Sequence, residues 1–122
     1  MIKAKYFSEG EFQKCTPPCS LQDMNQGTMS RLDTAREIAG IPFVLNSAFR
    51  SVEYETKHGR KGTSSHTLGY AVDIRCNSFA NRFKIVTALY EAGFNRIGVG
   101  KTYIHVDDSP KHQPNVMWDY YG

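Results

Sequence analysis

The chain has 122 residues, of which 40% are hydrophobic, and its formal net charge is +3. This length fits one domain over residues 1–122, and the apolar content is enough for a core, which excludes a disordered or fibrous chain. No apolar run approaches the roughly 20 residues of a membrane span. The first residues, MIKAKYFSEGEF, lack the apolar stretch of a signal peptide. The basic residues are dispersed and match no recognition motif, so we expect no nucleic-acid partner. We also expect a monomer.

Secondary structure is predicted from hydrophobic spacing and from residues that interrupt helices and strands. Pro17 and Pro18 disfavour a helix or a central strand near the N-terminus, because each proline removes a backbone donor. Gly40 and Pro42 end the first predicted helix. In chain order we predict loops over 1–27, a helix over 28–39, a strand over 43–45, helical turns over 52–58, a loop over 58–65, a strand over 70–75, a helix from 79, strands over 96–99 and 103–106, and a strand or cover within 115–121.

The clearest predicted helix follows Asn77 and Ser78, either of which is a good cap. Its apolar residues form one stripe that we expect to face the core, and Gly93 suits the left-handed position after the helix. The stripe consists of Phe79, Phe83, Val86, Leu89 and Tyr90. Together the elements predict an α+β domain with a small, mostly antiparallel sheet and flanking helices.

Three residues form a candidate metal site. His66 ends the polar loop, Asp73 lies in the next predicted strand, and His105 lies in a later strand. Two imidazoles and one carboxylate are three protein ligands, which leave a fourth position for water, as in catalytic rather than structural zinc sites. Zinc lowers the pKa of its bound water to about 7 and polarises carbonyl groups. A His and an Asp at this spacing are common by chance, so the spacing alone does not identify the site.

Three sequence blocks carry a family resemblance. The residues SSHTLGYAVD, 64–73, match the signature S-x-H-x-x-G-x-A-x-D at every fixed position. The residues SAFRS, 47–51, resemble the segment S-x-[YF]-R-[ST], and YIHVD, 103–107, resembles a strand with an aromatic-aliphatic-His-x-Asp pattern. In this order, the blocks resemble the M15 family of zinc peptidases, which includes D-alanyl-D-alanine carboxypeptidases and related peptidoglycan hydrolases such as phage endolysins. The resemblance covers roughly residues 20 to 120.

The resemblance implies a fold similar to that of D-Ala-D-Ala carboxypeptidases and hedgehog-like metallopeptidases. It assigns His66, Asp73 and His105 to Zn²⁺. It also implies zinc-dependent hydrolysis of peptidoglycan stem or cross-link peptides at or near D-alanine, and it leaves open whether the enzyme is a carboxypeptidase or an endopeptidase. The absence of a signal-peptide pattern fits a phage-lysin-like protein that is made in the cytoplasm and acts at the cell wall.

Three further residues receive roles near the substrate. The resemblance places Arg50 beside the substrate, where a permanently charged guanidinium can stabilise negative charge on the scissile carbonyl oxygen. Ser64 is expected to hydrogen-bond near the site and hold the loop. Tyr103 can donate a hydrogen bond to the same developing oxyanion.

The chain departs from the family pattern at the general base. Many members carry Glu or Asp three residues before the last zinc histidine, and this position is Thr102 here. Because side chains alternate along a strand, Asp107 is expected on the same face as His105. We predict that Asp107 is either the general base or an acceptor that orients a histidine. Asp108 and Glu53 are the other carboxylates considered for the base.

Several residues keep two interpretations. Cys15 and Cys19 can form a local disulfide in an oxidising compartment or remain free thiols, while Cys76 is expected to pack as a small hydrophobe. His58 and His112 are interpreted as surface residues.

The aromatic residues Trp118, Tyr120 and Tyr121 either pack over the sheet or line a substrate groove. The missing carboxylate before the last histidine also supports a second function, a non-catalytic zinc-containing module of the same fold that binds cell wall or a partner.

Overall fold

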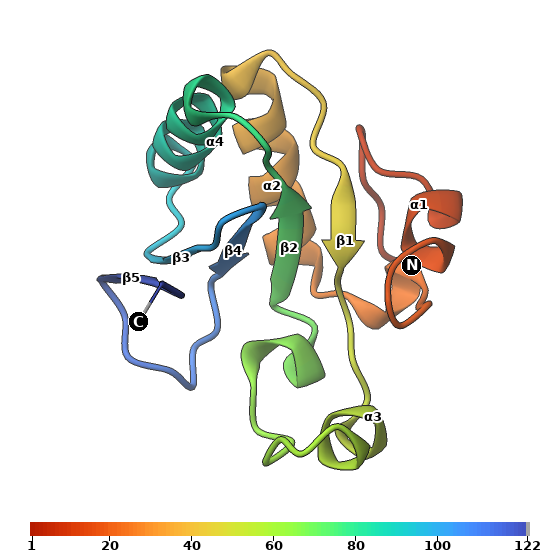
Figure 1. Cartoon of the computed structure of the whole chain (residues 1–122). Coiled ribbons are helices and arrows are strands. Elements are labelled where there is room, and N and C mark those ends of the chain that lie inside the picture. Colours follow the sequence, from red (N-terminus) through yellow and green to blue (C-terminus); the bar gives the residue numbers. More distant parts are fainter. Residues whose placement is uncertain (122) are drawn as a thin grey trace.

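The computed structural model describes residues 1–121. Helices and strands follow one another along the chain as labelled in Figure 1. They are α1 (Glu9–Gln13), the 3₁₀ helix η1 (Leu21–Asp23), α2 (Gln26–Ala39), β1 (Leu45–Ser47), α3 (Val52–Lys57), the 3₁₀ helix η2 (Ser65–Leu68), β2 (Ala71–Arg75), α4 (Phe79–Glu91), β3 (Arg96–Val99), β4 (Tyr103–Asp107) and β5 (Val116–Asp119). Within the described part, no helix has the length and hydropathy needed to cross a bilayer.

The five strands form one sheet in the order β1-β2-β4-β3-β5. The β1–β2, β2–β4 and β3–β4 pairs are antiparallel, whereas β5 runs parallel to β3. The α+β class is therefore confirmed, but the expected mostly antiparallel sheet is corrected to a mixed one. The reason is topological. Both edges of β4 are occupied, one by β2 and one by β3, so β5 pairs with the free edge of β3. The strand β5 starts at the end of the sheet where β4 finishes and β3 starts, and it therefore runs parallel to β3.

The sheet separates an apolar face from a polar one. Val72 and Ile74 of β2, and Ile104 and Val106 of β4, belong to the buried core together with residues of α2 and α4. The helices α2 and α4 pack against each other, and α4 also contacts β4 (Figure 1). Because side chains alternate along a strand, the intervening residues of β2 and β4 face the opposite side of the sheet, away from these helices.

The N-terminal region is more regular than predicted. Residues 1–27 contain α1 and η1, so the expectation of loops and turns alone was wrong. Each short helix begins with a capping box, Ser8 with Glu11 in α1 and Ser20 with Asp23 in η1. In such a box the two residues satisfy each other's backbone donors.

Two predicted boundaries also shift by about two residues. The helix expected over 28–39 begins at Gln26, because Asn25 accepts from the Thr28 amide. The strand expected over 43–45 lies at Leu45–Ser47.

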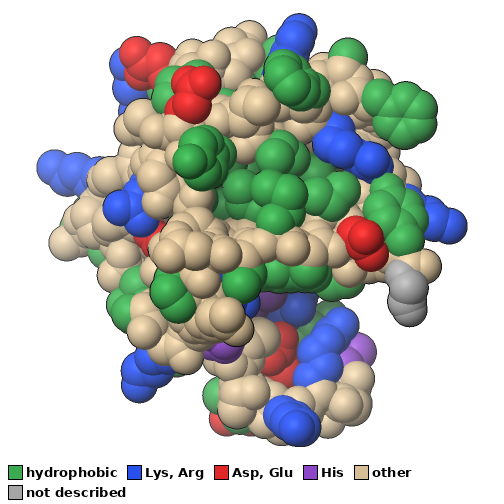
Figure 2. All heavy atoms as spheres, turned by 90° about the vertical axis from the view of Figure 1, so that its left-hand side faces the viewer, with side chains coloured by type: hydrophobic (Ala, Val, Ile, Leu, Met, Phe, Trp, Pro, Cys, Tyr) green, Lys and Arg blue, Asp and Glu red, His purple; other side chains and the backbone are tan. Residues whose placement is uncertain are grey.

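The helix α4 turns a different side to the core than the sequence predicted. Phe79, Phe83 and Tyr90 are 85%, 71% and 73% exposed, so their assignment to the core was wrong. The buried residues of α4 are instead Ile85, Ala88 and Leu89. These three occupy positions i, i+3 and i+4, which share one helix face and contact α2 and the sheet. Figure 2 shows hydrophobic side chains gathered on one exposed face of the molecule.

Candidate functional site

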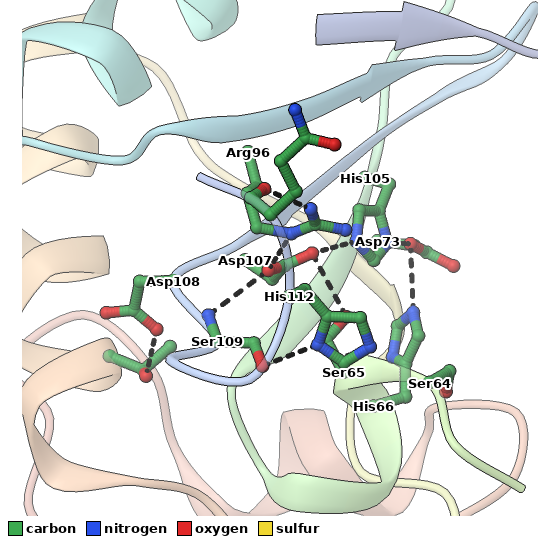
Figure 3. Close-up of polar contacts among 12 residues, drawn as sticks. Ser64, Ser65, His66, Asp73, Arg96, His105, Asp107, Asp108, Ser109 and His112 are labelled. Atoms are coloured by element: carbon green, nitrogen blue, oxygen red, sulfur yellow. Dashed lines mark hydrogen bonds and ion pairs between the residues drawn. The ribbon is translucent and has the colours of Figure 1, made fainter. Parts of the chain in front are cut away.

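The three candidate metal ligands meet on the polar face of the sheet. Asp73 of β2 and His105 of β4 are directly opposite each other in the antiparallel register. His66 lies in η2, which leads into β2. One possible ligand atom from each residue lies within 4.8 Å of the others, and all three residues are largely buried (Figure 3). The structure therefore brings together residues that are 39 positions apart in the chain.

A tight contact holds the loop that carries His66. Gly69 follows η2 with φ of +80°, a left-handed conformation that glycine adopts without strain. A Cβ atom at this position would lie 2.5 Å from the carbonyl oxygen of Asp23. The Gly69 carbonyl also accepts a hydrogen bond of 2.9 Å from the Asn25 amide. The signature glycine thus lets the loop lie directly against the backbone before α2.

The ring of His66 is oriented by a backbone carbonyl. Its Nδ1 lies 2.7 Å from the carbonyl oxygen of Ala48. Because a carbonyl can only accept, Nδ1 carries the proton and donates. The other nitrogen, Nε2, lies 3.4 Å from Asp73 Oδ1 and is free to act as a ligand.

The ring of His105 is oriented by a carboxylate. Its Nε2 lies 2.7 Å from Asp107 Oδ2, while its Nδ1 lies 3.0 Å from Asp73 Oδ1. When Nε2–H donates to Asp107, a neutral ring presents its Nδ1 lone pair to Asp73. The two imidazoles therefore direct one nitrogen each to the same carboxylate oxygen.

The charged groups of the site shift one another's pKa. Burial alone would raise the pKa of Asp73, but hydrogen bonds and charge from His105 and His66 hold it well below its ordinary value. Burial would lower the pKa of His105, but Asp107 and Asp73 raise it. Burial would also raise the pKa of Asp107, and His105, the Ser109 amide and Arg96 lower it instead. The site thus favours ionised carboxylates and a positive charge between them.

These donors fit a metal ion. Two imidazole nitrogens and an ionised carboxylate oxygen face one another closely, and each ring has its second nitrogen on an oxygen acceptor. Metal-binding histidines in proteins usually have such an acceptor on the second nitrogen, because it sets the tautomer and raises the basicity of the ligand. His66, Asp73 and His105 could therefore hold a metal with an open position for another ligand.

Arg50 links the metal-facing carboxylate to the rest of the pocket. Its Nη2 donates to Asp73 Oδ2 at 3.1 Å, its Nη1 pairs with Glu55 Oε2 at 3.3 Å, and its Nε donates to Ser47 Oγ at 3.0 Å. These bonds use three of the five N–H groups of a guanidinium. The remaining two leave Arg50, which lines the pocket, able to donate to a bound molecule.

Glu55 is a site residue that the sequence analysis missed. It is completely buried and accepts a 2.8 Å hydrogen bond from Ser64 Oγ as well as the ion pair from Arg50. Its Oε1 is buried without a partner among the described residues. The sequence gives no distinct signal for it, because Glu53 lies in the same turn of α3, and only the fold turns Glu55 toward the guanidinium.

Both carboxylate oxygens of Asp107 accept hydrogen bonds from other residues. It is completely buried, and Oδ2 accepts from Ser65 Oγ at 3.0 Å as well as from His105. Its Oδ1 accepts from Arg96 Nε at 2.7 Å and from the Ser109 amide at 3.1 Å (Figure 3). Of its two predicted roles, this geometry favours the acceptor that orients His105 over a proton acceptor open to the pocket.

The pocket above the ligands has a volume of about 360 Å³. Ser64 and Tyr103 line it. Trp118 and Tyr120 pack against Gly98 of β3 and also line the pocket. A Cβ atom at Gly98 would lie 2.6 Å from the Trp118 ring nitrogen. Tyr121, the third residue of that aromatic group, instead accepts a hydrogen bond from Arg82 at 2.7 Å.

Other predicted positions lie elsewhere or differ in exposure. His112, interpreted as a surface residue, lines the pocket. His58 is exposed and bonds to the carbonyl oxygen of Tyr54. Asp108 pairs with Thr28 and Arg31.

Among the remaining positions, Glu53 is exposed. The three cysteines are free thiols, with Cys15 and Cys76 buried and Cys19 partly exposed.

Comparison with known proteins identifies the family. The family model described as Peptidase M15 matches residues 5–107. The match includes the three candidate ligands, Arg50 and Asp107. No curated protein matches the sequence.

Proposed function

Because the chain belongs to the M15 peptidase family, we propose that it is a zinc-dependent peptidase that hydrolyses peptidoglycan stem or cross-link peptides at or near D-alanine. It would act as a monomer on peptides of the cell wall. The observation that carries this proposal is the convergence of two histidines and one aspartate at the base of a pocket.

The metal would be held by His66 Nε2, His105 Nδ1 and Asp73 Oδ1. When bound, zinc supplies a water that is nucleophilic near neutral pH and polarises the substrate carbonyl. The Ala48 carbonyl and Asp107 hold the two rings in the tautomers that the metal requires.

Other residues would act on the substrate. Arg50 is held by Asp73 and Glu55, so its unused N–H groups are fixed in direction and can stabilise negative charge on the scissile carbonyl oxygen. Tyr103, which lines the same pocket, can donate to that oxygen. Ser64 secures the loop by its bond to Glu55 and can contact the peptide.

Replacing Asp107 with asparagine separates its two possible roles. As an orienting acceptor, Asp107 is expected to contribute about 10-fold to 100-fold in metal affinity. The Asp107→Asn variant should therefore bind zinc more weakly, with turnover recovering when excess zinc restores occupancy. Metal titration followed by fluorescence, with kcat measured at each zinc concentration, checks this. A turnover that stays low at full zinc occupancy would instead assign Asp107 the proton-accepting role.

The second candidate is a non-catalytic zinc-containing module that binds cell wall or a partner. Two observations favour it. Thr102 stands where many family members place an acidic base. Both oxygens of Asp107 already accept hydrogen bonds within the protein.

The purified wild-type protein distinguishes the two functions. Elemental analysis is expected to find close to one zinc per chain, and mass spectrometry of treated peptidoglycan is expected to find new peptide ends at D-alanine. Removal of the metal with a chelator should stop product formation, and added zinc should restore it. Stoichiometric zinc without product on any wall type would support the binding module.

A further inference from the structure

A second hollow adjoins the metal pocket. We call it the distal hollow and define it by its lining residues Val52, Gly62, Thr63, Thr67, Leu68, Lys111 and His112. Its volume is about 430 Å³. His112 lines both this hollow and the metal pocket. The two hollows therefore meet at His112.

The wall between the two hollows is held in place by hydrogen bonds. His112 Nε2 lies 3.1 Å from the Thr63 carbonyl oxygen, so it carries the proton and donates. Its Nδ1 lies 2.7 Å from Ser109 Oγ, and the Ser109 amide donates to Asp107 at 3.1 Å (Figure 3). The position of His112 is thus linked through Asp107 to the ring of His105.

The distal hollow offers a specific chemistry. Val52 and Leu68 expose aliphatic side chains, which are 48% and 38% accessible although they lie beside a polar site. Lys111 adds a positive charge and has no ion-pair partner within residues 1–121. An aliphatic surface with one unpaired cation suits a ligand that carries a small apolar side chain and a carboxylate.

Part of this wall comes from the chain beyond the family match. The match ends at residue 107, and the segment that follows supplies Lys111 and His112, as well as Trp118 and Tyr120 of the metal pocket. The metal-facing residues belong to the matched region.

We propose that the distal hollow is a second substrate subsite, which binds an aliphatic side chain and a carboxylate of the peptide beyond His112. This inference rests on the proposed peptidase function. Such a subsite makes a cross-linked peptide, which extends on both sides of the cleaved bond, a better substrate than a single stem peptide that does not reach the distal hollow.

The test compares two substrates. The first is a stem pentapeptide ending in D-Ala-D-Ala, and the second is the same stem cross-linked to another stem peptide. The Leu68→Ser and Lys111→Ala variants are each expected to lower the ratio of kcat/KM for the cross-linked over the single peptide by about tenfold. Ile38→Ser and Lys101→Ala are matched controls at exposed positions that line neither hollow, and they should keep the wild-type ratio. Unchanged ratios in both test variants would overturn the subsite.

A binding measurement separates this inference from the proposed function. The zinc-loaded protein is titrated with the cross-linked peptide in which the scissile amide is reduced to a methylene-amine. Amide resonances of Thr67, Leu68 and Lys111 are expected to shift in NMR spectra. Shifts without hydrolysis of either natural peptide would reject the peptidase and retain the subsite. Hydrolysis without these shifts would reject the subsite and retain the peptidase.

Discussion

The His66→Ala variant is expected to lose stoichiometric zinc and at least about a thousandfold of the peptidase activity, because the nucleophilic water depends on the bound metal. His66 supplies one of three candidate ligands, and its ring is already fixed by the Ala48 carbonyl at 2.7 Å. Removing the ring leaves one imidazole and one carboxylate, which are too few to retain zinc firmly. Elemental analysis and product release from peptidoglycan measure the two losses.

A control is needed because a buried histidine can also matter for folding. His58→Ala removes an exposed imidazole outside the site and should keep the zinc content and activity of the wild type. Circular dichroism and thermal unfolding should show that His66→Ala remains folded. A folded His66→Ala protein that hydrolyses peptides without zinc would contradict the metal site and the proposed function together.

Arg50→Ala is expected to reduce kcat by about 100-fold to 1,000-fold, the usual cost of removing a donor to a developing oxyanion. The guanidinium also bridges Asp73 and Glu55, at 3.1 and 3.3 Å. Arg50→Lys keeps the charge but loses the planar fork, so it cannot reproduce all of these bonds and should recover only part of the rate. Steady-state kinetics on a stem peptide give kcat and KM for each variant.

The zinc content of the Arg50 variants shows where the effect arises. If Arg50 acts on the substrate, both variants keep zinc and lose kcat. If it acts only by holding Asp73, the loss of rate follows a loss of zinc and excess metal restores it. Arg31→Ala is the matched control, since Arg31 also pairs with an aspartate, Asp108, and lies outside the pocket. Arg50→Ala with wild-type kinetics would exclude both roles.

Local pattern predicted the central strands better than the buried face of a helix. Alternation in residues 70–75 and 103–106 predicted β2 and β4, and the expected side of Asp73 and His105 follows from the same period of two. In α4, however, apolar spacing pointed to Phe79, Phe83 and Tyr90, which are exposed. Two apolar stripes exist on that helix, and which one is buried depends on the contacts of α4 with α2 and the sheet.

The residues of the candidate site also divide into those that the sequence could reveal and those that only the tertiary structure reveals. The signature around His66 and Asp73, the later His105 and Arg50 could be found from sequence, because their residue types and order carry the chemistry. Glu55 and His112 could not, because nothing local distinguishes an ion-paired carboxylate or a pocket histidine from a solvated one. Glu55 becomes a site residue only when α3 turns it toward Arg50, and His112 only when its loop reaches Thr63.

By itself, the sequence determined the family, the α+β class and the three residues that can hold a metal. These depend on residue identity and short spacing, which survive without coordinates. The tertiary structure alone decided the mixed sheet, because the parallel pairing of β5 follows from which strand edge remains free. It also decided that Asp107 is enclosed by His105, Ser65, Arg96 and Ser109. Burial and hydrogen bonding are properties of distant segments packed together, and no local pattern encodes them.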